Sequence, residues 1–129
     1  MIVVGDASTF VSAAPKAGSL PERALLRAVT EPNHLILSQD VESEYREVIF
    51  RSKFNRFVSV ERRNLTAAGR VEAVEQIQEC SDPKDDKYLA LAAAGGADDI
   101  VNIDMRYLLS MHPWRGVSVL SPADYLGVP

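Results

Sequence analysis

The chain has 129 residues, 47% hydrophobic and 25% charged, with a formal net charge of −4. We expect one globular domain over residues 1–129 with a core of its own. No apolar run is long enough to cross a bilayer, and the first four apolar residues lead straight to Asp6 without the basic segment of a signal peptide. A lone cysteine, Cys80, excludes an internal disulfide and a thiolate metal cage, so we expect a cytoplasmic protein.

The charge is distributed unevenly along the chain. Residues 1–45 carry −3, residues 46–70 carry +5 and residues 71–129 carry −6. A basic middle segment between acidic ones is typical of a surface that faces phosphate groups. A solvated helix face with salt bridges explains the same pattern equally well, so both interpretations stay open.

The first elements follow from an apolar run and a helix cap. Residues 2–5 are apolar up to Asp6, which predicts a buried parallel strand. Ser19 and Glu22 have the spacing of a capping box, in which serine caps the helix and glutamate stands three residues later. The pair predicts a helix that ends before Pro32.

The next segment alternates between strand and helix patterns. Residues 34–37 form a second apolar strand, and a helix follows from residue 40 to about residue 51. Glu44 lies within the apolar progression of that helix, which places its carboxylate at the core edge or in a polar cleft. A further helix is expected over residues 59–68. Residues 71–75 fit either helix or strand, and we favour strand.

Asp82 and Pro83 open the central helix, because aspartate is a favoured cap and proline a favoured first residue. Gly95 and Gly96 end that helix. The remaining predicted elements are a strand over residues 100–103, a short helix over 105–111, a strand over 117–120 and a helical turn at 121–124. Strands that alternate with helices predict an α/β domain with a mostly parallel sheet.

Acids stand where such a sheet binds ligands. Asp6 and Asp104 each follow a predicted strand, and ligands bind beyond the carboxyl ends of parallel strands. Asp82 and Asp86 share one face of a helix N-terminus, which favours negative charge. Converging carboxylates need a cation, and an all-oxygen site suits Mg²⁺ or Mn²⁺. Helix capping explains Asp82 more simply, and turn chemistry accounts for Asp6 and Asp104 equally well.

Four sequence blocks resemble the PIN-domain family, especially the toxin components of bacterial toxin–antitoxin modules. The blocks are V-V-G-D-A-S-T-F-V-S-A at 3–13, S-Q-D-V-E-S-E-Y-R-E-V-I at 38–49 with R-S-K-F at 51–54, D-P-K-D-D-K-Y-L-A-L-A at 82–92, and G-G-A-D-D-I-V-N-I-D at 95–104. Their order and spacing carry the resemblance. It implies a three-layer α/β/α Rossmann-like domain with a mostly parallel central sheet of four to five strands.

The resemblance also implies an activity, which is cleavage of RNA by an endoribonuclease whose metal ion activates a water molecule. It assigns the catalytic and metal-binding acids to Asp6, Glu44, Asp86 and Asp104. We add supporting roles for Ser8, which would orient an acid or water, and for Asp82, which would cap the helix and position Asp86. We also add an RNA-binding role for Lys53, Arg56, Lys87 and Arg106. The implied partners are RNA, a cognate antitoxin and a second copy of the chain, without a membrane.

Two departures from the family pattern affect these assignments. Arg106 stands where many relatives have a second aspartate, and Ser8 stands where many have asparagine. The arginine removes a possible metal ligand and adds a cation for phosphate, so we expect one metal ion. The departures favour an alternative, a catalytically silent PIN-fold module that binds a partner protein. A receiver-type phosphoacceptor domain fits less well, because no lysine follows the strand at 117–120.

Overall fold

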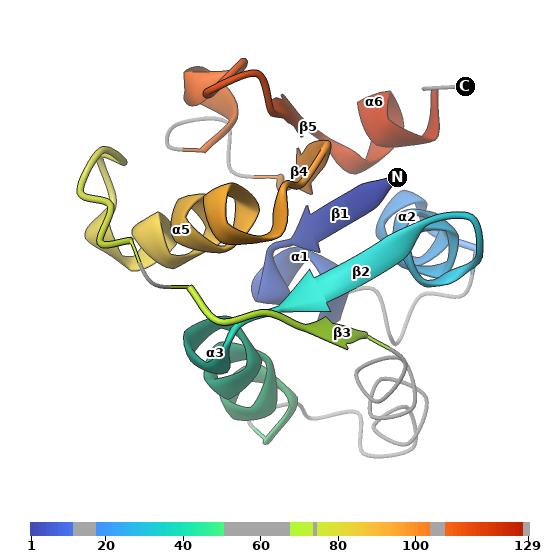
Figure 1. Cartoon of the computed structure of the whole chain (residues 1–129). Coiled ribbons are helices and arrows are strands. Elements are labelled where there is room, and N and C mark those ends of the chain that lie inside the picture. The colour runs from blue at the N-terminus through green and yellow to red at the C-terminus, as the bar shows by residue number, and fades with distance from the viewer. Residues whose placement is uncertain (12–17, 51–67, 74, 104–107, 128–129) are drawn as a thin grey trace.

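The strands form a single parallel sheet (Figure 1). The computed structural model describes residues 1–11, 18–50, 68–73, 75–103 and 108–127. Within these ranges the sheet has five strands in the order β3-β2-β1-β4-β5, and all neighbours pair in parallel. The strands are β1 (Ile2–Gly5), β2 (His34–Leu37), β3 (Gly69–Arg70), β4 (Asp99–Val101) and β5 (Ser118–Leu120). The predicted α/β class with a parallel sheet is confirmed.

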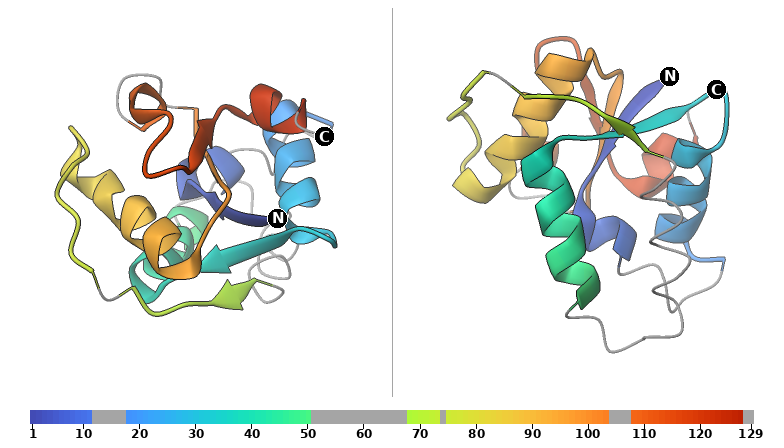
Figure 2. Two further views of the ribbon diagram at one scale, coloured as in Figure 1. Left: turned by 45° about the horizontal axis from the view of Figure 1, so that its top comes forward. Right: turned by 60° about the horizontal axis from the view of Figure 1, so that its bottom comes forward.

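Helices cover both faces of this sheet (Figure 2). They are α1 (Ala7–Val11), α2 (Leu20–Val29), α3 (Gln39–Phe50), α5 (Asp86–Gly95) and α6 (Pro122–Leu126), with 3₁₀ turns η2 (Pro83–Asp85) and η3 (Leu109–Met111). The chain moves in one direction from β1 to β3 and then returns past β1 to β4. Because parallel crossovers are right-handed, α5 lies on the face opposite α2 and α3. No helix of the described residues has the length and apolar character needed to span a membrane.

A serine cap begins helix α2 and a glycine ends helix α5, both at positions that the sequence predicts. Ser19 caps α2 by accepting a hydrogen bond from the Glu22 amide at 3.4 Å, which confirms the predicted serine cap. The Glu22 side chain accepts from the Gly18 amide at 3.2 Å, one residue before the position that a capping box requires. Gly96 ends α5 in the left-handed region, at φ 61°. A Cβ atom on Gly95 would lie 2.3 Å from Cδ1 of Ile36, so this glycine lets α5 pack closely on β2. The two adjacent glycines therefore have different roles.

Close packing also fixes the end of β1. A Cβ atom on Gly5 would lie 2.1 Å from the ring of Phe10, which is fully buried in α1. The Tyr45 hydroxyl of α3 donates a hydrogen bond to the Gly5 carbonyl oxygen at 2.8 Å. The chain therefore leaves β1 at a point held by two helices, and the next residue is Asp6.

The strand that we favoured at residues 71–75 is wrong for the described residues 71–73. The edge strand β3 is Gly69–Arg70, whereas residues 71–73 have no regular structure. The Val71 amide still donates to the Leu37 carbonyl oxygen at 2.8 Å, but β2 ends at Leu37, so the ladder has no further partner residues. The apolar pattern marked a segment that packs against the core without strand pairing.

Smaller differences occur near the chain's last third. The strand expected at residues 100–103 spans Asp99–Val101, and the helix expected over 105–111 is described only as the 3₁₀ turn η3. The expected helix over 59–68 lies outside the described residues except for Ala68, which is in a bend. Among the described residues the predicted order of elements holds apart from helix α1, which was not predicted.

Asp99 is a buried carboxylate at the start of β4. It is 3% exposed, and its Oδ2 atom has no hydrogen-bond partner among the described residues. Burial raises the pKa of Asp99, and the charge of Asp98 raises it further. The guanidinium of Arg27 opposes this shift without cancelling it. A raised pKa means that the ionised carboxylate destabilises the folded chain.

We therefore predict that Asp99→Asn stabilises the protein at neutral pH by about 1 kcal/mol, since the amide carries no charge to desolvate. The stability that protonated Asp99 contributes is complete below its ordinary pKa and is lost as the pH rises through the raised folded-state pKa. The advantage of the variant should therefore vanish below about pH 4. Urea unfolding between pH 4 and 8 measures it.

The matched control for this experiment is Asp98→Asn. Asp98 is exposed, and its Oδ2 atom accepts a hydrogen bond from the Ile2 amide at 2.8 Å. Asp98→Asn removes one charge that raises the pKa of Asp99, but it also removes the charged acceptor of the Ile2 amide. It should therefore stabilise the chain less than Asp99→Asn. Equal stability of wild type and Asp99→Asn at pH 8 would contradict the argument from burial.

Candidate functional site

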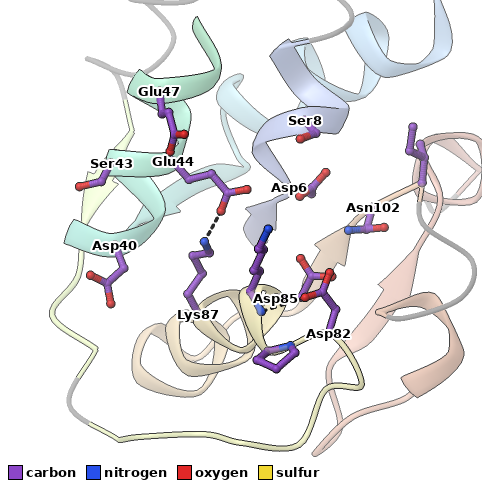
Figure 3. Close-up of a pocket in the computed structure, with 13 residues that line it drawn as sticks. Asp6, Ser8, Asp40, Ser43, Glu44, Glu47, Asp82, Asp85, Lys87 and Asn102 are labelled. Carbon is purple, nitrogen blue, oxygen red and sulfur yellow. Dashed lines mark hydrogen bonds and ion pairs between the residues drawn. The ribbon is translucent and has the colours of Figure 1, made fainter. Parts of the chain in front are cut away.

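An acidic pocket of about 930 Å³ lies at the carboxyl edge of the sheet (Figure 3). It is built from the ends of β1 and β4, the N-terminal half of α3, and the turn that leads into α5. Six carboxylates and two lysines line it. The full lining is Asp6, Ser8, Asp40, Ser43, Glu44, Glu47, Asp82, Pro83, Lys84, Asp85, Lys87, Asn102 and Ile103. The excess of negative charge makes the pocket suited to a cation.

Asp6 is the anchored acid of the pocket and is 8% exposed. Its Oδ2 atom accepts hydrogen bonds from the Thr9 amide at 2.9 Å and the Thr9 hydroxyl at 2.8 Å. Thr9 Oγ1 also accepts a hydrogen bond from the Ile103 amide at 3.3 Å. The Asp6 amide donates to the Val101 carbonyl oxygen at 3.0 Å. Asp6 and Thr9 thus tie the end of β1 to the end of β4.

Tyr88 supports the same carboxylate from α5. Its fully buried hydroxyl accepts a hydrogen bond from the Ala7 amide at 3.1 Å and is also hydrogen-bonded to Asp6. Burial raises the pKa of Tyr88, and the charge of Asp6 raises it further, so the phenol keeps its proton. A protonated hydroxyl that already accepts from Ala7 can donate to Asp6. Tyr88 therefore adds to the hydrogen bonds from Thr9, and its effect on the pKa of Asp6 is the smaller one.

The pKa of Asp6 is raised. Burial is the main cause, and the charge of Glu44 adds to it, whereas the hydrogen bonds from Thr9 and Tyr88 act in the opposite direction. A carboxylate in this situation favours either a proton or a nearby cation. The pocket therefore holds an acid that a bound cation would stabilise in its ionised form.

Glu44 projects from α3 into the pocket opposite Asp6 (Figure 3). Its Oε2 atom forms an ion pair with the Lys87 ammonium of α5. The two side chains are 23% and 24% exposed. A positive charge is thus already present beside Glu44.

The turn before α5 separates its three aspartates. Asp82 caps the 3₁₀ turn η2 by accepting a hydrogen bond from the Lys84 amide at 3.0 Å. The prediction that Asp82 and Pro83 open the central helix is wrong in its boundary, because α5 begins at Asp86. Asp82 and Asp85 both line the acidic pocket. Asp86 is not part of that lining, and its Oδ1 atom accepts hydrogen bonds from the amides of Glu79 at 3.1 Å and Cys80 at 2.8 Å. Asp86 lines a neighbouring pocket instead.

Five residues that the sequence singled out therefore meet in one pocket: Asp6, Ser8, Glu44, Asp82 and Lys87. Asp86 is not brought to it. The other four, Lys53, Arg56, Asp104 and Arg106, lie outside the described residues.

Several residues at the site were not predicted from the sequence, among them Thr9, Asp85, Tyr88 and Asn102. A signal existed for Thr9, because it stands three residues after a strand-end aspartate, as in a helix cap. Tyr88 gave none, since a tyrosine in an apolar run is typical of a core residue.

Two of the seven basic side chains in residues 46–70 are described, and both face Glu42. Arg46 Nη2 and Arg70 Nη2 lie 3.0 and 3.1 Å from Glu42 Oε1. The side chains of the two arginines are 74% and 46% exposed. For these two residues the interpretation as a salt-bridged solvated face holds.

The pocket offers the donor atoms that a divalent ion prefers, but its described acids do not converge on one point. Among the described residues, no three histidine, cysteine, aspartate or glutamate side chains converge as a metal site would require. The donors are nevertheless all oxygen atoms, which Mg²⁺ and Mn²⁺ prefer. The raised pKa of Asp6 and the ammonium beside Glu44 both indicate that a cation is favoured here.

A Rossmann-like α/β fold with an acidic pocket at the carboxyl edge of its strands defines the class of protein. A family model described as PIN domain matches residues 2–106, and the chain belongs to the PIN-domain family. The fold also resembles a chain of VapBC2 from Rickettsia felis bound to a DNA fragment from their promoter. The TM-score is 0.62, with 14% identity over 94% of this chain and 98% of that chain. No curated protein matches the sequence significantly.

We predict that Thr9→Val lowers the free energy of unfolding by about 2 kcal/mol. The substitution preserves size but removes the hydroxyl that donates to the buried Asp6 carboxylate and accepts from the Ile103 amide. The Ile103 amide then lacks its partner, and Oδ2 of Asp6 keeps only the bond from the backbone amide of residue 9. Urea unfolding at neutral pH measures the loss.

The control is the same substitution at an exposed threonine, Thr30→Val at the end of α2. Its effect should stay within about 0.5 kcal/mol. If Thr9→Val and Thr30→Val unfold at the same urea concentration as wild type, Thr9 does not hold the site together.

Proposed function

We propose that the protein is a metal-dependent endoribonuclease of the PIN type. PIN domains are in general nucleases, and they typically use divalent metal ions. The observation that carries the proposal is the buried Asp6 carboxylate, held opposite Glu44 at the carboxyl edge of a parallel sheet. This is the edge at which α/β folds bind ligands.

Asp6, Glu44 and Asp104 are the proposed ligands of an Mg²⁺ or Mn²⁺ ion. When bound, such an ion supplies a Lewis acid that activates water and offsets the charge developing on a phosphodiester. Asp6 is suited to this role because Thr9 and Tyr88 hold its carboxylate in one position. Asp104 follows Ile103, whose amide is bound to Thr9, and its assignment rests on the family resemblance.

We propose Asp85 as the third acid of the turn, in the role that the resemblance assigns to Asp86. Asp85 lines the same pocket as Asp6. One oxygen of Asp86 already accepts two backbone hydrogen bonds, from Glu79 and Cys80. Asp86 is then a structural residue that closes the loop in front of α5.

Lysines and arginines around the pocket would hold the RNA backbone. Lys84 and Lys87 line the pocket itself. Lys53, Arg56 and Arg106 are added on the basis of the sequence alone, and Arg106 supplies a guanidinium where many relatives have a carboxylate. Phosphate contacts of this kind position a strand without selecting its sequence. Ser8, exposed at the start of α1, is proposed to orient an acid or a water molecule.

The proposed partners follow from the toxin-like sequence blocks. They are a cognate antitoxin and a second copy of the chain, in the cytoplasm. The likeness of the fold to a chain of VapBC2 from Rickettsia felis supports this setting.

We predict that Asp6→Asn and Asp104→Asn each reduce Mg²⁺-dependent cleavage of RNA by about 100-fold or more, since each removes a charged ligand from the ion. Cleavage of a labelled RNA, followed over time with Mg²⁺ and with EDTA, measures the rate. Asp124→Asn, an exposed acid on α6, is the control and should cleave at the wild-type rate. Wild-type rates in the two test variants would overturn the proposal. A wild-type chain without cleavage would support the silent interaction module.

Asp85→Asn and Asp86→Asn separate the two neighbouring acids. We predict that Asp85→Asn weakens Mn²⁺ binding by about tenfold, with little change in stability. Asp86→Asn should lower the free energy of unfolding by about 1–2 kcal/mol, because two backbone amides lose a charged acceptor, and should leave Mn²⁺ affinity near wild type. Isothermal titration and urea unfolding measure the two effects. The reverse pattern would assign the ligand to Asp86.

A further inference from the structure

Lys87 connects the two helices that close the acidic pocket. It is the second residue of α5, and its ammonium reaches across to Oε2 of Glu44 in α3 (Figure 3). About three quarters of each side chain is buried. The Lys87 ammonium also lies 5.9 Å from the centroid of the Tyr88 ring. The lysine is therefore held inside the pocket wall and does not extend into solvent.

The surroundings explain why a lysine is accommodated there. The residues that line the pocket include Asp6, Asp40, Glu47, Asp82 and Asp85 in addition to Glu44. Lys84 is the other lysine of the lining, and it is exposed at the turn before α5. Oε2 of Glu44 is buried and has no hydrogen-bond partner among the described residues, so the ion pair with Lys87 is the interaction that compensates its charge.

We propose that Lys87 is an internal competitor for the metal ion, which occupies the cation position beside Glu44 until an ion replaces it. This inference rests on the proposed function, because it assumes that Glu44 is a metal ligand. Glu44 cannot give the same oxygen fully to both cations, so its use by the ion weakens its pair with Lys87. The ammonium then becomes available to an anionic phosphate group of the substrate.

The arrangement has two consequences that differ from those of a simple RNA-binding lysine. The ion pair lowers the affinity of the pocket for metal, because its loss is part of the cost of metal binding. It also stabilises the metal-free chain, because without it the buried Oε2 atom of Glu44 has no partner among the described residues. A lysine that only contacts RNA would affect neither quantity.

Titration of Mn²⁺ into wild type and Lys87→Met at fixed pH tests the proposal. Methionine keeps much of the apolar stem and removes the charge. The variant should bind Mn²⁺ about 3- to 10-fold more tightly, the range expected when a competing ion pair is lost. In EDTA it should melt at a lower temperature than wild type, and saturating Mn²⁺ should raise its melting temperature by more.

Two further variants isolate the contact from the general loss of charge. Lys84→Met removes the other lysine of the same pocket, so it measures how far any lost positive charge strengthens binding. Its gain in affinity should be clearly smaller than that of Lys87→Met. Glu44→Gln should cancel the gain, so that Lys87→Met/Glu44→Gln binds Mn²⁺ no more tightly than Glu44→Gln alone.

The outcomes distinguish this inference from the proposed function. If wild type binds Mn²⁺ and Lys87→Met binds it equally or more weakly, the competitor role is overturned while the metal site stands. An equal gain in Lys84→Met also overturns it, since charge alone then explains the effect. If neither wild type nor Lys87→Met binds Mn²⁺, both the inference and the proposed metal dependence are overturned.

Discussion

The burial of one carboxylate, that of Asp6, is the constraint on which the site depends. A buried carboxylate is costly unless hydrogen bonds or a cation compensate its charge. Thr9 supplies two of the hydrogen bonds, and Tyr88 supports the carboxylate from α5. The same contacts join the ends of β1 and β4, because Thr9 also binds the Ile103 amide. The same hydrogen bonds thus position Asp6 and join the carboxyl ends of β1 and β4.

The hydrogen bonds compensate the charge of Asp6 only in part, which bears on the function of the pocket. The pKa of Asp6 remains raised, mainly by burial and then by Glu44. The pocket as a whole carries more negative than positive side chains. Such an arrangement reduces the stability of the chain without a bound cation and increases its affinity for one. The ion pair between Lys87 and Glu44 fits this balance, because it supplies positive charge from within the fold.

Local patterns predicted most of the elements, because each depends on neighbours in the sequence. The apolar runs of β1 and β2 and the Ser19 cap of α2 are examples. The prediction of a strand at residues 71–75 failed because it rested on composition. Strand pairing at this edge depends on where β2 ends, and β2 ends at Leu37. In the site, Asp6 was predictable as a strand-end acid. The different roles of Asp85 and Asp86 were not predictable. They depend on which of the two side chains meets the backbone amides of Glu79 and Cys80 in the folded chain.

The sequence by itself therefore determined the α/β class, the order of most elements, the strand-end position of Asp6 and, through its ordered blocks, the PIN family. The class, the elements and the position of Asp6 follow from periodicity, capping and spacing, which act over short stretches of chain, whereas the family follows from the resemblance of the blocks to PIN domains. Only the tertiary structure decided that Tyr88 supports Asp6, that Asp86 accepts backbone hydrogen bonds from Glu79 and Cys80, and that Lys87 pairs with Glu44. Those contacts join residues from separate elements, and no local preference specifies which side chains meet when α3 and α5 converge on the same edge of the sheet.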